Sequence, residues 1–126
     1  KEHNMKFAIE GDWIADIGSF HSLKPSEFDI EAIETSSIFQ ISQEDLIDLY
    51  VQHPQFDRHF RIEIENEFIE LQKRVLHNIG STAMERYVDF VACHPVLLNR
   101  ISNVQIASYL GMTPEFFSKI RKGVIG

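Results

Sequence analysis

The chain has 126 residues, 44% of them hydrophobic, and a formal net charge of -7, so we expect one or two small folded domains rather than a disordered chain. This acidity argues against a protein that coats nucleic acid over its whole surface. With a single cysteine (Cys93), no run of about 18 apolar residues and no signal-peptide pattern, the sequence predicts a protein of the reducing cytoplasm without a membrane span.

The sequence from residue 5 to 42 has β character. Residues 5–9 and 28–34 alternate between apolar and polar side chains, residues 38–41 form another short strand signal, and turn signals lie between them. This spacing predicts the C-terminal part of an antiparallel β-roll. Because Lys1 is not an initiator methionine and no turn or cap precedes the first expected strand, we expect the chain to lack the N-terminal part of this domain.

The next stretch is predicted to be helical. Ser42 is a suitable N-cap for a short helix that ends near residues 53–54. From residue 55 to 79 the apolar residues recur at steps of three and four, which predicts an amphipathic helix of about seven turns. Its first apolar stripe consists of Phe56, Phe60, Ile64, Phe68, Leu71, Val75 and Ile79. A second stripe, at steps of seven, consists of Ile62, Ile69 and Leu76.

Two apolar stripes on one helix need two surfaces to cover them. One stripe can pack on the helix's own domain, and the other can pack on the same helix of a second subunit. The alternative is that both stripes are buried within one subunit, but so small a chain offers little else to cover them. We therefore predict a homodimer with Ile62, Phe68, Ile69 and Leu76 at its interface.

A second helical part follows Gly80, which we expect to end the long helix and to act as a hinge. Residues 82–85 form a capping box for a helix that Pro95 ends, and residues 96–101 connect this helix to the next one. The inner face of the capped helix is expected to consist of Tyr87, Val88, Phe90 and Val91.

Residues 103–122 are typical of two short helices with a tight turn between them. Gly111 can end the first helix in the left-handed conformation, while Thr113 and Pro114 suit the N-cap and first turn of the second. The inward positions are Ile106, Ala107, Leu110, Phe117 and Ile120. This pattern predicts a helix-turn-helix, although an ordinary helical hairpin follows the same rules.

The outward positions of the second helix are polar and mostly basic. They are Glu115, Ser118, Lys119, Arg121 and Lys122. The charged residues from residue 97 onward sum to a positive charge, whereas nearly all the acidic residues precede them. A basic C-terminal segment in an otherwise acidic chain predicts that this second helix enters a DNA major groove.

Other kinds of site are not indicated. Neither the pair His53 and His59 nor the pair Cys93 and His94 has a second ligand pair at zinc-site spacing. No nucleophile, base and acid occur as a recognisable set. We therefore predict no catalytic residue, no metal site, no cofactor and no enzymatic activity.

Three motifs resemble one known family. They are EGDWIADIGSF (residues 10–20), STAMERY (residues 81–87) and IASYLGMTPE (residues 106–115). With the order of the elements, they resemble the Crp/Fnr-type bacterial transcription regulators (the cyclic-AMP receptor protein family), in a Bacteroidetes-like branch. The resemblance implies an α+β, helix-rich fold. Residues 1–54 would form part of a cyclic-nucleotide-binding-like β-roll and the following helix, residues 55–80 a dimerisation helix and hinge, and residues 81–126 a helix-turn-helix DNA-binding domain.

The resemblance also implies a homodimer that binds a two-fold DNA site and acts with RNA polymerase. In the family, the glutamate at the position of Glu115 accepts from a cytosine amino group, and the basic residue at the position of Lys119 donates to a guanine. Pro114 stands where the family has an arginine, so we expect one base contact to be lost. Phosphate contacts are expected from Thr113, Ser118, Arg121 and Lys122. The alternative is a protein-interaction module whose helix-turn-helix no longer binds DNA, which Pro114 and Phe116 favour.

The resemblance is weakest at the sensor pocket. Family members that bind cyclic nucleotides have a glycine and a glutamate where this chain has Ala15 and Asp16, and an arginine that is missing around Ser26. Since Glu27 is acidic, a cyclic phosphate would bind poorly there, and we predict no tight binding of cyclic AMP. Trp13, Asp16 and Ser26 are candidates for lining the pocket of an unknown small-molecule effector; the alternative is an empty or filled pocket.

Overall fold

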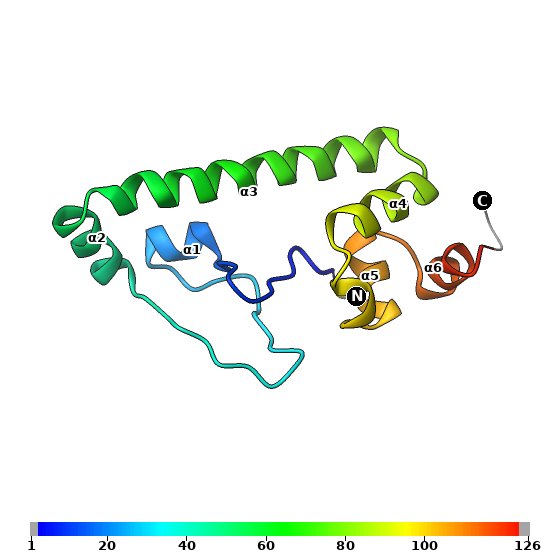
Figure 1. The fold of residues 1–126 in the computed structure, drawn as a ribbon, viewed down its shortest axis with the longest axis horizontal. Helices are drawn as coiled ribbons and strands as arrows, with labels where there is room; N and C mark the ends of the chain where they lie inside the picture. Colours follow the sequence, from blue (N-terminus) through cyan, green and yellow to red (C-terminus); the bar gives the residue numbers. More distant parts are fainter. Residues whose placement is uncertain (1–2, 124–126) are drawn as a thin grey trace. The chain divides into compact units, whose positions relative to one another are not determined.

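The computed structural model describes residues 3–123, whose regular structure is helical (Figure 1). The elements are α1 (Ile17–Ser22), α2 (Gln43–Gln52), α3 (Gln55–Gly80), α4 (Ala83–Cys93), the 3-10 helix η1 (Leu97–Asn99), α5 (Asn103–Leu110) and α6 (Pro114–Arg121). Residues 3–123 contain no β-strand, so the predicted α+β fold class, with its part of a β-roll, is wrong.

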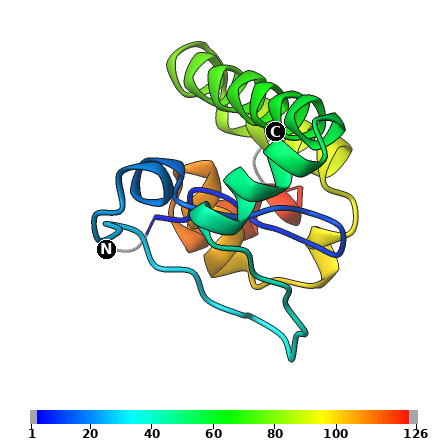
Figure 2. The ribbon, with the colours of Figure 1, turned by 90° about the vertical axis from the view of Figure 1, so that its left-hand side faces the viewer.

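The predicted strands are absent for a common reason. Residues 5–9, 28–34 and 38–41 have no regular structure, and the stretch between α1 and α2 runs as an open loop (Figure 2). Alternating side chains show only which residues share a face of an extended chain. A strand exists when its N–H and C=O groups pair with those of a neighbouring strand, and none of the described residues supplies that neighbour.

Helix α1 lies inside the stretch predicted to be β. Asp16 is its N-cap, since the carboxylate accepts a hydrogen bond from the backbone N–H of Ser19 at 3.2 Å. Leu23 ends the helix in the left-handed conformation, with a φ of 61°. Gly18 and Ser19 indicate a turn in the sequence, which is why it predicts no helix there.

The chain divides into two compact units. One unit comprises the residues up to Glu10 together with those from Leu71 onward, and the other comprises Gly11–Glu70. The division passes through α3, whereas the sequence predicts domain boundaries after residues 54 and 80.

The unit formed by Gly11–Glu70 has a small aromatic core around Phe60, which is 8% exposed. The ring centroids of Trp13 and Tyr50 lie 4.6 Å and 5.8 Å from that of Phe60, both edge-on. Helix α2 is confirmed, and Ser42 is its N-cap, because the hydroxyl accepts from the backbone N–H of Asp45 at 3.1 Å.

Helix α3 confirms the predicted long amphipathic helix. Of its apolar residues only Phe60 is buried. At the predicted dimer interface the exposed fractions are 41% for Ile62, 59% for Phe68, 45% for Ile69 and 67% for Leu76. Within residues 3–123 both stripes are therefore exposed apart from Phe60, and their burial against a second subunit stays a prediction.

The unit that contains α4, η1, α5 and α6 has the larger core. Its buried residues are Phe90, Leu97, Ile106, Ala107, Leu110 and Phe117. Of the predicted inner face of α4, Phe90 is 2% exposed and Tyr87 packs against the core. Val88 is 58% exposed, so its predicted burial is wrong: this short helix turns only a narrow stripe towards α5.

Candidate nucleic-acid interface

The turn between α5 and α6 has the geometry predicted for a helix-turn-helix. Gly111 ends α5 in the left-handed conformation, with a φ of 74°. The backbone N–H of Met112 donates to the carbonyl of Ala107 at 3.0 Å, and that of Gly111 donates to the carbonyl of Ser108 at 3.3 Å. These two bonds form a Schellman motif, in which the left-handed residue is unstrained only because glycine has no Cβ.

Helix α6 begins as predicted. The hydroxyl of Thr113 accepts from the backbone N–H of Phe116 at 3.2 Å, and Pro114 occupies the first turn, where no intrahelical donor is required. Beneath the turn, Ala107 and Phe117 are both 0% exposed. The small side chain of Ala107 lets α5 and α6 approach closely enough for Phe117 to fill the space between the helices.

The side of α6 opposite Phe117 and Ile120 is polar and accessible. Glu115, Lys119 and Lys122 are exposed, and Glu115 lies one turn before Lys119. Neither lysine forms an ion pair within residues 3–123. Of the other predicted contact residues, Thr113 is exposed and Pro114 and Ser118 are half-buried. This face offers one carboxylate acceptor and two ammonium donors at its outer edge.

Arg121, predicted as a phosphate contact, forms hydrogen bonds within its own unit. Its guanidinium donates to Oδ1 of Asn103 at 2.6 Å and to the carbonyl of Leu98 at 3.4 Å. These bonds join the last turn of α6 to the first turn of α5 and to η1. Arg121 therefore links the end of the helix-turn-helix to its beginning. The spacing of residues along the sequence does not reveal this contact.

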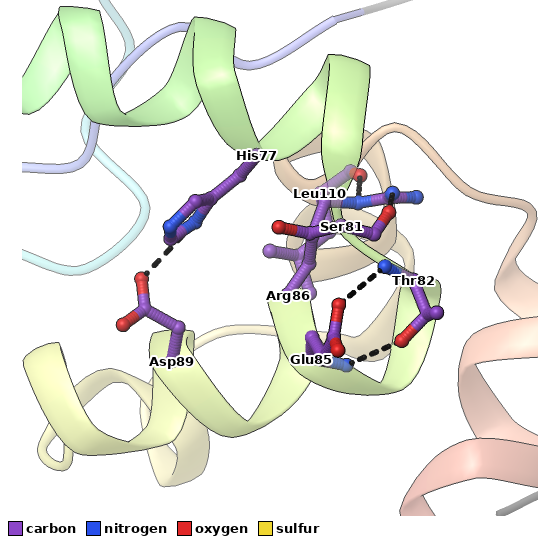
Figure 3. Close-up of polar contacts among 7 residues, drawn as sticks. All are labelled: His77, Ser81, Thr82, Glu85, Arg86, Asp89 and Leu110. Carbon is purple, nitrogen blue, oxygen red and sulfur yellow. Dashed lines mark hydrogen bonds and ion pairs between the residues drawn. The ribbon is translucent and has the colours of Figure 1, made fainter.

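Two arginines that the sequence analysis does not single out hold the C-terminal end of α5. Nε of Arg86 in α4 donates to the carbonyl of Leu110 at 3.2 Å, and Nη1 donates to the carbonyl of Ser81 at 3.0 Å (Figure 3). Nη2 of Arg74 in α3 donates to the carbonyl of Tyr109 at 3.0 Å, and its guanidinium lies 3.9 Å from the centre of the Tyr109 ring. The last carbonyls of a helix lack intrahelical donors and carry the negative end of its dipole, so both cations stabilise α5.

The corner between α3 and α4 is stabilised by polar contacts. The backbone N–H of Thr82 donates to Oε2 of Glu85 at 2.7 Å, and that of Glu85 donates to the hydroxyl of Thr82 at 3.2 Å, which confirms the predicted capping box (Figure 3). Nδ1 of His77 in α3 lies 3.4 Å from Oδ2 of Asp89 in α4. Helix α3 ends at Gly80, as predicted, while the role of this glycine as a hinge stays a prediction.

Two of the three effector-pocket candidates contact each other, and the third packs elsewhere in the unit. The hydroxyl of Ser26 donates to Oδ2 of Asp16 at 2.6 Å. This bond, together with the one from the backbone N–H of Ser19, holds the pKa of Asp16 below its usual value. Trp13 packs against Phe60 instead. A shallow pocket in this unit is lined by Ser19, Phe20, Leu23, Lys24, Pro25, Ile41, Ser42 and Gln43. None of the three candidates lines it.

The described residues offer neither a metal site nor a membrane span. Within residues 3–123, no three His, Cys, Asp or Glu side chains gather into a group that could hold a metal ion. The helices of that range include none with the length and apolar character that crossing a bilayer requires. His53, His59 and His94 instead lie against the rings of phenylalanine residues.

Comparison of the chain with protein-family models, curated proteins and solved structures found no match.

Proposed function

We propose that the protein is a homodimeric DNA-binding transcription regulator of the Crp/Fnr type, which acts in the cytoplasm with RNA polymerase as a partner. The observation that carries this proposal is the two-sided character of α6. Phe117 and Ile120 are buried, while Glu115, Lys119 and Lys122 are exposed on the other side. Such a helix fits a major groove, where a carboxylate accepts from cytosine N4 and a lysine donates to guanine O6 and N7.

The exposed stripes of α3 support the homodimer. Leu76 and Phe68 are more than half exposed, and apolar surface of this kind gains about 25 cal/mol per Å² when a partner covers it. A two-fold dimer presents two copies of α6, which predicts a DNA site made of two related half-sites.

A gel-shift experiment against genomic fragments at two salt concentrations tests the proposal. We expect binding that survives competitor DNA and weakens steeply between about 50 and 200 mM salt, because Lys119 and Lys122 would displace counterions from phosphates. The double variant Lys119→Glu/Lys122→Glu should lose binding, whereas Lys24→Glu, in a loop of the other unit, should retain it. A wild-type chain that binds no fragment at the lower salt contradicts the proposal and supports the alternative, a protein-interaction module that retains the helix-turn-helix.

A further inference from the structure

Residues 4–10, which we call the strap, lie on the helix-turn-helix despite their distance along the chain. The backbone N–H of Asn4 donates to the hydroxyl of Ser108 at 2.9 Å, and its side-chain Nδ2 donates to the carbonyl of Gln105 at 3.1 Å. The partners are 104 and 101 positions away in sequence, so these bonds bring the two ends of the described chain together. The strap therefore contacts the first helix of the helix-turn-helix directly.

Further along the strap, an aromatic contact and an ion pair continue this attachment. The ring of Phe7 lies 5.3 Å from that of Tyr109, and Phe7 packs against the core of the unit. The carboxylate of Glu10 accepts two hydrogen bonds from Arg100, at 3.0 Å and 3.4 Å. Because Glu10 is 82% exposed, this pair contributes little, and Phe7 and Asn4 carry most of the attachment.

One side chain joins the strap to two helices. Arg74, in α3, donates to the carbonyl of Met5 in the strap and to the carbonyl of Tyr109 in α5, and it stacks on the Tyr109 ring. Only the planar fork of a guanidinium can make these contacts together, since an ammonium has neither the plane nor the second nitrogen. The strap, α3 and α5 are thus held at one point.

The chain connects its two units twice, and the strap is one of the connections. It passes from one unit to the other after Glu10 and again within α3, after Glu70. Gly11 follows the strap at a φ of +87°, with open space around its Cβ position, so the chain turns there as soon as the strap ends. The strap is therefore the part of its unit that leads directly into the unit formed by Gly11–Glu70.

We propose that the strap holds the helix-turn-helix in one pose on α3, so that the two α6 helices of the dimer keep one spacing on DNA. Release of the strap leaves α4, α5 and α6 folded around their own core and in contact with α3 through Arg74 and His77, so that they turn more readily at Gly80. This inference rests on the proposed function. The strap acts through α5 and contributes no base contact of its own.

Hydrogen exchange of the full chain without DNA tests whether the strap is docked. In Asn4→Ala/Phe7→Ala we expect the α5 amides to exchange about tenfold faster than in wild type, because the side-chain hydrogen bond of Asn4 to Gln105 and the ring contact of Phe7 with Tyr109 are lost. Met5→Ala is the matched control, since its side chain is 52% exposed and its backbone carbonyl still accepts from Arg74. Equal exchange of α5 in wild type and the double variant overturns the inference.

A series of DNA duplexes with different spacers between two half-sites tests the pose. Wild type should prefer one spacer. Asn4→Ala/Phe7→Ala should bind the duplex with that spacer about tenfold more weakly than wild type does. Its affinities for the duplexes with other spacers should be nearly equal to one another. Its affinity for a single half-site should equal that of wild type. Arg74→Lys should behave like the double variant, and Arg58→Lys, on the same helix, like wild type.

Two results in this series overturn the inference. An equal loss on every DNA, single half-site included, means that the substitutions only destabilise the fold, and an unchanged spacer preference means that the strap does not set the pose. If the wild-type chain binds no DNA at all, the proposed function is wrong. The exchange experiment then still decides whether the strap is docked, so the two failures are distinguishable.

Discussion

Glu115 offers the only carboxylate on the outward side of α6, and its exposure leaves it available to a base edge. We expect Glu115→Ala to relax specificity at one position of each half-site, at a cost of about 1–3 kcal/mol, because a cytosine amino group loses its acceptor. Selection of binding sites from a random DNA pool measures this, with Glu27→Ala, in the other unit, as the control. Recovery of the same motif at the same stringency by wild type and Glu115→Ala means that Glu115 does not contact a base.

Lys122 caps the C-terminal end of α6, where a phosphate contact carries no sequence information. Lys122→Ala should weaken binding to all sequences alike and lower the slope of log affinity against log salt by about one unit. The slope is measured by titration at several salt concentrations, with Lys24→Ala as the control. A loss confined to particular sequences would show that Lys122 contacts a base instead.

The hydrogen bond between Ser26 and Asp16 lies where the resemblance to Crp/Fnr-type regulators would place the phosphate of a cyclic nucleotide. An aspartate is ionised at neutral pH, and the hydrogen bond from Ser26 holds the pKa of Asp16 lower still. A cyclic phosphate near Ser26 would therefore meet a negative charge, and the sequence around Ser26 contains no arginine. We expect calorimetry to show no tight binding of cyclic AMP. Micromolar or better affinity would refute this expectation.

At the scale of single elements, the capping box of α4 begins the helix that leads from α3 to the helix-turn-helix. Thr82→Ala removes the acceptor for the backbone N–H of Glu85 and should lower the free energy of unfolding by about 1 kcal/mol. Urea denaturation measures this change. Thr35→Ala, in an exposed irregular segment, is the matched control and should leave the midpoint unchanged. An equal shift in both variants would contradict the role of the cap.

At the scale of the whole molecule, we expect the proposed homodimer to form through the exposed stripes of α3. Ile69→Glu/Leu76→Glu places two charges in the predicted interface and should give monomers by light scattering, since an unpaired buried charge is strongly unfavourable. Glu70→Lys, on the polar side of the same helix and not at a spacing of three or four from the interface residues, should leave the dimer intact. A wild-type chain that stays monomeric at high concentration would defeat the homodimer.

Local signals explain what could be predicted from the sequence. The bounds of α3, the caps at Ser42 and Thr82, and the left-handed Gly111 depend on residues within about one helical turn of each other, and the structure confirms them. The buried positions of the helix-turn-helix follow from the same short spacing, since Ala107 and Phe117 fill the contact that the turn creates. DNA binding and the homodimer remain predictions that the experiments above test.

The sequence by itself therefore determined helices α2 to α6, the caps at Ser42, Thr82 and Thr113, and the two-sided character of α6, because these depend on near neighbours along the chain. Only the tertiary structure decided that residues 5–9 form no strand, since a strand requires a partner that alternation does not name. It also decided that Arg121 bonds within its own unit and that Arg74 and Arg86 hold the end of α5. Each of these contacts joins residues that lie 18 to 35 positions apart, and the pairing of an arginine with one carbonyl or amide among many is set by how the helices pack.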